Sequence, residues 1–339
     1  MAGAETQITE NNVTAKPKSL KDIRLPIEKD LKEFQLYYKK ALKTDVFLLN
    51  QIISYLLKMK GKEMRPILVI LSARLCGKVN ESTFTAATMI ELLHTATLIH
   101  DDVVDEADQR RGFFSINRIW KNKASVLLGD YLLSRGLLVA LDNDEFAHLK
   151  VLSNAVKRMS EGELRQLKAS KMLNMTEEKY FKIISEKTAS LLSACCKCGA
   201  ISATEDVKTH ELLGEIGEHL GIAFQIRDDL FDFGADDVGK PKGNDIRERK
   251  ITLPMIAALN RCGILERKKL MRKFGKRNKS QQEVTDIVNI VREKDGIAYA
   301  RTHMDSHTSK ALTLLNHFPE SDERQDMLDF IRFVTTRKK

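Results

Sequence analysis

Residues 91–112 read ELLHTATLIHDDVVDEADQRRG, and residues 221–233 read GIAFQIRDDLFDF. Each stretch holds a run of mostly apolar residues followed by the pattern Asp-Asp-x-x-Asp. On a helix, residues four apart lie on one face a turn apart, so the first and last carboxylates of each pattern share a face. A helix that is apolar on its other sides is buried along most of its length. The sequence therefore predicts two buried helices, each with carboxylates gathered at its C-terminal end.

The two acidic clusters need positive charge beside them. Two carboxylates about 6 Å apart repel each other by roughly 3 kcal/mol at an effective dielectric of 20. One such cluster could equally be a solvated acidic turn, but two at the ends of buried helices favour a cation site. Oxygen-only ligands select Mg²⁺ or Mn²⁺, and Mg²⁺ commonly shares its coordination shell with substrate phosphates, so we predict a clamp for a metal-bound diphosphate. The predicted metal ligands are Asp101, Asp102, Asp105, Asp228, Asp229 and Asp232.

The rest of the chain predicts an all-helical protein. Its 339 residues hold six prolines, with none between Pro66 and Pro241, and proline inside a helix costs about 3 kcal/mol. Apolar residues recur at helical spacing from about residue 27, and no alternating pattern bounded by tight turns predicts a β-sheet. We expect a flexible polar arm over residues 1–20 and one helical domain, a single large bundle, over residues 21–339. The expected helices cover residues 27–44, 46–59, 66–77, 81–107, 123–141, 145–171, 177–203, 206–234, 251–261 and 265–275, with several more to about 337.

Composition excludes several classes of protein. The net charge of +9 is interpreted as a solvated surface with lysine spread along the chain, and without an aromatic-rich basic stripe we expect no nucleic-acid partner. The five cysteines are uneven in spacing and predict packing rather than disulfides or zinc. No uncharged apolar run reaches about 18 residues, so we expect no transmembrane helix. A cytoplasmic protein follows, although a basic surface could still rest on a membrane.

Basic residues complement the acidic clusters. In GKEMRP, residues 61–66, Lys62 and Arg65 stand where the proline would open a helix, and a helix N-terminus with basic neighbours attracts anions. Each basic residue taken alone is most often an ordinary surface residue. Their combination with two acidic clusters indicates a diphosphate site. The other candidates are Arg110, Arg111, Lys187 with Thr188, Lys240 and Lys250.

Together these motifs resemble the trans-isoprenyl diphosphate synthases of the polyprenyl synthetase family. Two Asp-Asp-x-x-Asp patterns with the basic segments are far more specific than one pattern, and they span most of the chain in the order of the family. The resemblance implies the isoprenoid synthase fold, a helical bundle around a central cavity. The matching segments are GKEMRP at 61–66, LIHDDVVDEADQRRG at 98–112, LLGDYLL at 127–133, EGELRQL at 161–167, KTA at 187–189, FQIRDDLFDF at 224–233 and GKPKGNDIRERKITLP at 239–254.

By this resemblance, the protein joins isopentenyl diphosphate to an allylic diphosphate, works as a homodimer and uses Mg²⁺, with three ions when substrate is bound. The implied catalytic residues are Lys187, Thr188, Gln225, Asp101 and Asp228. Isopentenyl diphosphate would contact Lys62, Arg65, His94 and Arg111. The allylic diphosphate would contact Arg110, Lys187, Thr188, Gln225, Lys240 and Lys250. No protein nucleophile is needed, because electrostatic stabilisation and positioning supply most of the rate.

The length of the product depends on the helix that precedes Asp101. Ala96 and Thr97, about one turn earlier, are small, whereas short-chain members of the family tend to carry an aromatic ring there. A helix rises about 5.4 Å per turn, roughly one isoprene unit, so an open path past Leu93 and Met89 predicts about seven to ten units. The resemblance is closest to octaprenyl-type synthases and implies a role in quinone biosynthesis.

Four alternatives stay open at this point. The small residues before Asp101 could serve only close helix packing, and the product could be geranylgeranyl or farnesyl diphosphate. A terpene cyclase would not need Lys62, Arg65 and His94 for a second diphosphate. A non-catalytic partner subunit of a prenyl synthase tends to lose one acidic cluster, and both are present here.

Overall fold

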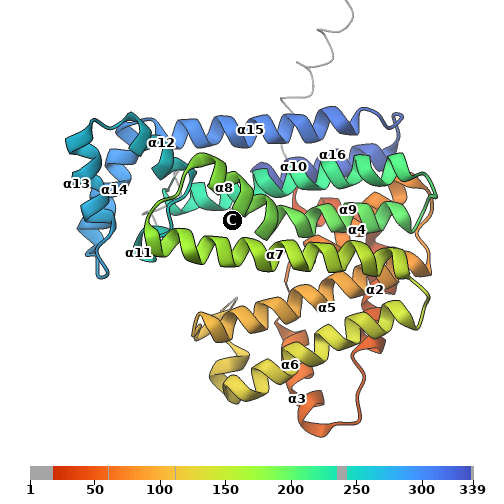
Figure 1. The fold of residues 1–339 in the computed structure, drawn as a ribbon. Coiled ribbons are helices and arrows are strands. Elements are labelled where there is room, and N and C mark those ends of the chain that lie inside the picture. The colour runs from red at the N-terminus through yellow and green to blue at the C-terminus, as the bar shows by residue number, and fades with distance from the viewer. Residues whose placement is uncertain (1–17, 60, 111, 235–242, 337–339) are drawn as a thin grey trace, which may run out of the picture.

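The computed structural model describes residues 18–59, 61–110, 112–234 and 243–336. Over these residues the chain is a bundle of long helices (Figure 1), which confirms the predicted fold class. The helices are α1 (Leu20–Arg24), α2 (Glu28–Ala41), α3 (Phe47–Lys58), α4 (Met64–Cys76), α5 (Glu81–Val104), α6 (Ile116–Leu141), α7 (Phe146–Met172), α8 (Glu177–Ile184), α9 (Ser190–Ile201), α10 (Val207–Asp232), α11 (Asn244–Arg247), α12 (Leu253–Arg261), α13 (Ile264–Phe274), α14 (Gln281–Glu293), α15 (Gly296–Leu315) and α16 (Asp322–Thr336).

The structure departs from the sequence prediction in short elements. Ser19 caps α1 inside the predicted polar arm, most of which (residues 1–17) lies outside the described residues. A 3₁₀ turn (Leu25–Ile27) follows α1. A two-residue hairpin of β1 (Gln109–Arg110) and β2 (Phe113–Phe114) forms where no strand was predicted, because Gly112 takes a positive φ of 80° at its turn. Such short elements carry too few residues for a periodic pattern.

The predicted helix over 177–203 is interrupted in its middle. A π-helical turn (Ser185–Ala189) separates α8 from α9, and the chain continues in helical geometry on both sides of it. Hydrophobic spacing barely changes across one wide turn, so the sequence pattern reads as one helix. Single π-turns inside α-helices are frequent at functional sites.

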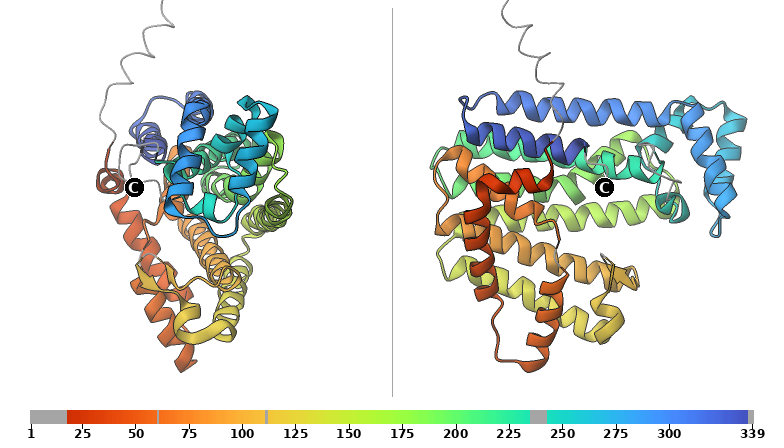
Figure 2. Two further views of the ribbon diagram at one scale, coloured as in Figure 1. Left: turned by 90° about the vertical axis from the view of Figure 1, so that its left-hand side faces the viewer. Right: turned by 180° about the vertical axis from the view of Figure 1, so that it is seen from behind.

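The two helices that carry the acidic patterns run in the same direction through the bundle. α5 packs along α6, and α10 lies between α9 and α15, while α4 packs on α9 (Figures 1 and 2). The C-terminal ends of α5 and α10 therefore point toward the same end of the molecule, where α11 and the β1–β2 hairpin also lie (Figure 1). This arrangement brings both acidic clusters to one end of the bundle.

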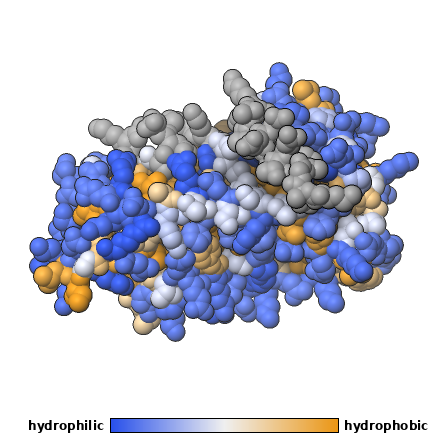
Figure 3. All heavy atoms as spheres, turned by 90° about the horizontal axis from the view of Figure 1, so that it is seen from above, coloured by the Kyte–Doolittle hydropathy of each residue, from blue (hydrophilic) through white to orange (hydrophobic). Residues whose placement is uncertain are grey.

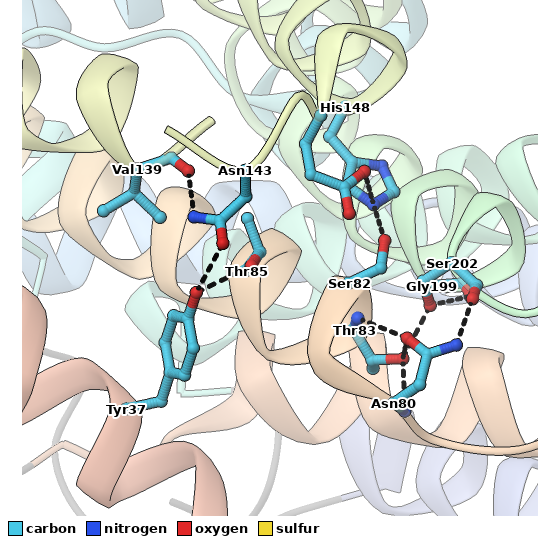
Figure 4. Close-up of polar contacts among 11 residues, drawn as sticks. Tyr37, Asn80, Ser82, Thr83, Thr85, Val139, Asn143, His148, Gly199 and Ser202 are labelled. Carbon is cyan, nitrogen blue, oxygen red and sulfur yellow. Dashed lines mark hydrogen bonds and ion pairs between the residues drawn. The ribbon is translucent and has the colours of Figure 1, made fainter. Parts of the chain in front are cut away.

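A network of polar contacts holds the opposite end of α5 (Figure 4). Asn80 accepts a hydrogen bond from the Thr83 backbone N–H and donates to the Ser202 carbonyl at 2.6 Å. Thr83 and Ser202 also join their buried hydroxyls at 2.7 Å. Ser82 pairs with the His148 ring at 3.0 Å, which adds α7 to the network. Because α5 is fixed to α7 and α9 at its start, the position of its acidic end is set by a straight, buried helix.

One helix among the described residues, α6, is long and apolar enough to cross a membrane by length and composition alone. About two-fifths of its most apolar window is buried inside the bundle. The helix packs along α5, and its exposed leucines lie on its outer side. The apolar character of α6 thus has a partial explanation in helix packing.

Candidate active site

The second acidic cluster lies at the end of α10, in the interior. Asp229 is 5% exposed; it accepts a 2.6 Å hydrogen bond from the Tyr180 hydroxyl and a 2.9 Å bond from the Gln225 amide. Asp232 is also buried and accepts from the backbone N–H groups of Asn244 and Asp245 at 2.8 and 2.9 Å. The carboxylate of Asp232 thus caps the N-terminus of the short helix α11, whose first N–H groups donate to it.

The ionised forms of these buried carboxyl groups are poorly compensated by their neighbours. Burial, with the charges of Asp245 and Asp228, raises the pKa of Asp229 to about 8. Burial and the nearby Asp232 raise the pKa of Asp245 to about 6. A carboxylate that resists ionisation in this way is stabilised by any cation brought beside it. The cluster therefore fits a ligand that carries positive charge, such as a metal ion.

The first acidic cluster ends α5. Asp101 and Asp105 are exposed, whereas Asp102 is 3% exposed and lines a neighbouring apolar cavity. Burial opposes the charge of Lys250, yet its pKa is raised because Glu248, Asp245 and Asp105 all stabilise the ammonium group. The charges of Asp105 of α5 and Asp245 of α11 therefore both act on Lys250.

A cavity of about 130 Å³ opens between α7, α8, α10 and α11. It gathers side chains that the sequence placed far apart: Lys187, Thr188, Gln225, Asp229, Asp245 and Lys250. Five of these six were predicted site residues, and they come from three separate segments of the chain. These five residues therefore line one cavity, whereas Asp101, Asp105 and Asp228 are not among its lining residues.

The π-turn places Lys187 and Thr188 in this cavity. Thr188 donates a 2.7 Å hydrogen bond to the Gln225 side-chain oxygen, and Gln225 in turn donates to Asp229. Lys187 forms an ion pair with Glu163 at 2.5 Å and reaches Gln166 at 3.5 Å. A chain of hydrogen bonds thus fixes the orientation of the Thr188 hydroxyl and the Gln225 amide.

Residues behind the π-turn hold its shape. Arg158 donates to the Ser185 hydroxyl at 2.8 Å and to Glu218 at 2.8 Å, and Ser185 donates to Glu218 at 2.5 Å. A Cβ atom on Gly162 would lie 2.8 Å from the backbone nitrogen of Lys187, and one on Gly221 would lie 2.4 Å from the Cα of Ala189. The turn is therefore clamped between α7 and α10 at two glycines that permit close backbone approach.

The predicted isopentenyl diphosphate residues lie in part around a second cavity, of about 460 Å³. Lys62 and Arg65 line it, together with Phe224 of α10 and Phe330 of α16. His94 is 7% exposed and is not among the residues that line this cavity. The structure therefore brings two of the predicted cations together beside apolar walls.

Three of the four predicted chain-length residues are buried before the first acidic cluster, and Thr97 is half-buried. Ala96, Leu93 and Met89 are at most 5% exposed, and the Thr97 hydroxyl donates to the His94 carbonyl at 2.8 Å. None of the four lines the apolar cavity of about 120 Å³ between α2, α3 and α5, which Thr95 lines instead. These residues pack inside the bundle on another face of α5.

Some predicted residues lie outside the described part of the chain, and others were missed. Arg111, Lys240 and the side chain of Arg110 fall outside it. The sequence prediction gave no role to Tyr180, Glu163 or Asp245. Tyr180 lies seven residues before Lys187 and so shares a helical stripe with it, which is the signal that could have identified it.

A metal ion would need donors beyond the protein. Within the described ranges, no three His, Cys, Asp or Glu side chains are grouped closely enough to hold an ion. The donors present are carboxylate oxygens, which suit Mg²⁺, and Mg²⁺ usually completes its shell with water and substrate phosphates. The raised pKa values of Asp229 and Asp245 fit such a shared ion, because a cation beside them would stabilise their ionised forms.

Comparison with known proteins agrees with this site. The family described as polyprenyl synthetase matches residues 46–291. An all-trans-nonaprenyl-diphosphate synthase (geranyl-diphosphate specific) of Rhodobacter capsulatus is 35% identical over 319 residues, covering 93% of this chain and 97% of the relative. A decaprenyl diphosphate synthase structure from Rhodobacter capsulatus superposes with a TM-score of 0.89 at 32% identity, over 95% of this chain and 100% of the other. A polyprenyl synthase from Caulobacter crescentus, complexed with calcium and isoprenyl diphosphate, gives 0.87 at 32% identity, over 96% and 100%.

The chain therefore belongs to the polyprenyl synthetase family. It is a trans-prenyl diphosphate synthase, a prenyltransferase with the isoprenoid synthase fold. The resemblance drawn from the acidic and basic motifs is confirmed.

The packing of the π-turn predicts the effect of one methyl group. Gly162→Ala should push the Lys187 backbone away from α7 and lower kcat about tenfold or more, because small displacements of positioning groups are costly. Gly214→Ala is the matched control, since its Cβ would meet atoms no closer than 3.6 Å. Steady-state prenyl transfer and circular dichroism should show lower activity in a folded Gly162→Ala protein and normal activity in the control. Equal kcat for both variants would contradict a tight fit at the turn.

Proposed function

We propose that the protein elongates an allylic diphosphate with isopentenyl diphosphate, in the presence of Mg²⁺, to a long-chain product of about seven to ten isoprene units. The observation that carries the proposal is the cavity that gathers Lys187, Lys250 and the carboxyl groups of Asp229 and Asp245 from separate segments of the chain. Lysine and carboxyl side chains on the walls of one cavity, together with Thr188 and Gln225, suit a metal-bound diphosphate.

Carboxylates of both clusters would hold the Mg²⁺ ions. Asp101, Asp105 and Asp228 are the proposed principal ligands, and the Caulobacter crescentus relative was crystallised with a divalent ion and an isoprenyl diphosphate. Mg²⁺, when bound, would supply positive charge that stabilises the diphosphate as it leaves. Lys187 and Lys250 would add charge-assisted hydrogen bonds to the same diphosphate from the other walls of the cavity.

The hydrogen-bonded chain around Asp229 would orient groups near the developing carbocation. The Thr188 hydroxyl donates its hydrogen bond to Gln225. The lone pairs of its oxygen would therefore face a positive centre in the cavity. The Gln225 amide is fixed because it donates to Asp229, which Tyr180 holds from the other side. Such pre-oriented dipoles need no reorganisation when charge develops.

Isopentenyl diphosphate would bind in the neighbouring cavity. Lys62 and Arg65 would hold its diphosphate, and the apolar walls formed by Leu192, Phe224 and Phe330 would hold its hydrocarbon part. The double bond then attacks the allylic cation, and the released diphosphate is the nearest base for the proton that is lost. No protein side chain has to form a covalent bond.

The elongation assay tests the reaction directly. Isopentenyl diphosphate, farnesyl diphosphate and Mg²⁺ should give products longer than farnesyl diphosphate, and chelation with EDTA should abolish them. Asp228→Asn should lower kcat at least about a hundredfold, since it removes negative charge from a metal-binding cluster. Thin-layer chromatography after dephosphorylation measures product length. Failure of the wild-type protein to elongate, with every primer from geranyl to geranylgeranyl diphosphate, would sink the proposal.

A long product has support from the small residues below Asp101. The similarity to nonaprenyl and decaprenyl diphosphate synthases favours a long product over a short one. Ala96 and Thr97 also place no aromatic ring one turn before the acidic cluster. The proposed path for the growing chain follows the Ala96, Leu93 and Met89 face of α5; these side chains are packed in the structure, so their neighbours would have to move as the chain grows. The proposed role in quinone biosynthesis depends on this long product, which would become the quinone side chain.

Paired phenylalanine variants test that path. Thr97→Phe should shorten the mean product by about one isoprene unit or more, because a ring would block the path one helical turn below the diphosphate. Thr95→Phe is the control, since Thr95 lines the separate apolar cavity beside α2 and α3. Chromatographic sizing of the products distinguishes the two. Shortening by Thr95→Phe alone would place the growing chain in the other cavity.

We also propose that two copies associate through α6. Leu127, Leu138 and Leu141 are 43–59% exposed and fall near one stripe of this helix, which suits a partner helix. The pair of substitutions Leu127→Glu and Leu138→Glu should convert a dimer into a monomer in sedimentation velocity. Their control is Leu265→Glu, which changes a leucine of α13 that is even more exposed, at 74%. A wild-type protein that sediments as a monomer at micromolar concentration would contradict the dimer.

A further inference from the structure

The positive charge of the protein is concentrated in one segment. Residues 261–280, RCGILERKKLMRKFGKRNKS, hold nine Lys and Arg and one Glu, a net charge of +8. The whole chain carries +9, so all other residues together are almost neutral. The expectation that lysine is spread along the chain was therefore wrong, because a composition count hides a local cluster. A cluster of this size needs its own physical account.

This segment forms one arm of a helical hairpin that projects from the bundle. α13 and α14 stand at the end of the molecule beyond α12 (Figures 1 and 2). The inner side of α13 is anchored by Leu270 and Phe274, which are at most 2% exposed. The hairpin is thus a packed element, and the charges are presented on a fixed helix.

The outer side of α13 combines cations with exposed aliphatic residues. Ile264 and Leu265 are 78% and 74% exposed at its first turn. In Figure 3, where this end of the molecule is on the left, an apolar patch lies at the tip beside hydrophilic surface. Four exposed cations follow within two turns: Arg267, Lys268, Lys269 and Arg272.

Ion pairs within the hairpin use other members of the cluster. Lys273 pairs with Asp286 at 3.1 Å, and Lys276 pairs with Glu283; the two acidic partners lie on α14. The only acidic residue of the segment, Glu266, pairs with Lys294 at 2.9 Å. These pairs hold the hairpin together and leave the outward cations of α13 facing solvent.

We propose that the outer face of α13 is a docking surface for an anionic lipid bilayer. A helix with Lys and Arg on its exposed side and large aliphatic residues at one end lies stably at the boundary of headgroups and acyl chains. The cations would pair with acidic headgroups, and Ile264 and Leu265 would enter the apolar boundary. Nucleic acid fits less well, because the only aromatic residue of the segment, Phe274, is buried and cannot stack on bases.

The docking surface is connected to the wall of the active site. Arg247 of α11 donates to the Lys279 carbonyl at 3.0 Å and to the Gln281 side chain at the start of α14. The same short helix donates hydrogen bonds to Asp232 from the backbone N–H groups of Asn244 and Asp245. Docking would therefore hold the active-site end of the bundle near the bilayer, whatever length of product the enzyme makes.

Vesicle co-sedimentation with the full-length protein tests the surface. Binding should be strong to vesicles that contain phosphatidylglycerol and weak to vesicles of phosphatidylcholine alone. Raising NaCl from about 0.1 M to about 1 M should release the protein, since the Debye length falls from about 10 Å to about 3 Å. Each cation near an anionic bilayer strengthens binding about fivefold, so the combined Lys268→Gln, Lys269→Gln and Arg272→Gln variant should bind at least about tenfold more weakly.

A matched variant separates local charge from net charge. Lys150→Gln, Lys157→Gln and Lys208→Gln remove three exposed cations from α7 and α10, and vesicle binding should stay normal. Ile264→Ser with Leu265→Ser should weaken binding about fivefold or more, because two aliphatic side chains lose a buried position. Prenyl transfer without vesicles should be normal in all three variants, so loss of docking is separated from loss of the enzyme.

Three results would overturn the proposal. The α13 variant could bind as tightly as the α7–α10 control, or the protein could bind equally to both kinds of vesicle. Tighter binding to a DNA or RNA duplex than to phosphatidylglycerol vesicles would assign the cations to nucleic acid. Unchanged binding of the Ile264→Ser and Leu265→Ser protein would overturn the insertion of the first turn into the bilayer.

Discussion

The structure depends on carboxylates that are held inside a helical bundle without enough positive charge around them. Asp229 is the centre of this arrangement: burial raises its pKa to about 8 even though Tyr180 and Gln225 both donate hydrogen bonds to it. A protein that only needed stability would place an apolar residue there, because an unpaired buried charge is expensive. The cost is understandable if the missing charge arrives with the substrate. Binding of a metal ion together with its diphosphate would then stabilise the ionised form of Asp229.

The same carboxylate also organises the uncharged part of the site. The hydrogen bond that Asp229 accepts from Gln225 orients this amide, and the amide oxygen accepts a hydrogen bond from the Thr188 hydroxyl. Thr188 lies on the π-turn. That turn is supported from behind by the contact of Ser185 with Arg158 and Glu218. Electrostatics and backbone geometry are therefore coupled: a helix that bulges at one turn aims its hydroxyl at a cavity, and buried polar contacts keep the bulge in place. A regular helix through 185–189 would turn Lys187 and Thr188 by a different angle about the axis.

The features that the sequence predicts well are those repeated over many residues. Long apolar runs ending in paired carboxylates gave both helices and their acidic ends, and the basic segments gave Lys187 and Lys250, which share a cavity with Asp229. Features that depend on one turn or one contact were not predictable. No residue marks the π-turn, and the role of Asp245 depends on where α11 folds back onto α10. The grouping of charge on α13 was visible in the sequence, but a total of +9 concealed it until charge was counted by segment.

Positive charge in this protein has two physically distinct uses. In the cavity, single cations such as Lys187 and Lys250 are half-buried, are paired with carboxylates in the described structure, and stand where a diphosphate would compete for them. Their effect is strong because it acts at short range in a partly desolvated place. On α13 the cations are exposed, clustered and screened by water, so each contributes little alone and the group acts only on an extended anionic surface. A free diphosphate in solution would meet both sets, but only the cavity can hold it in one orientation. The two groups can therefore serve one enzyme without competing for the same ligand.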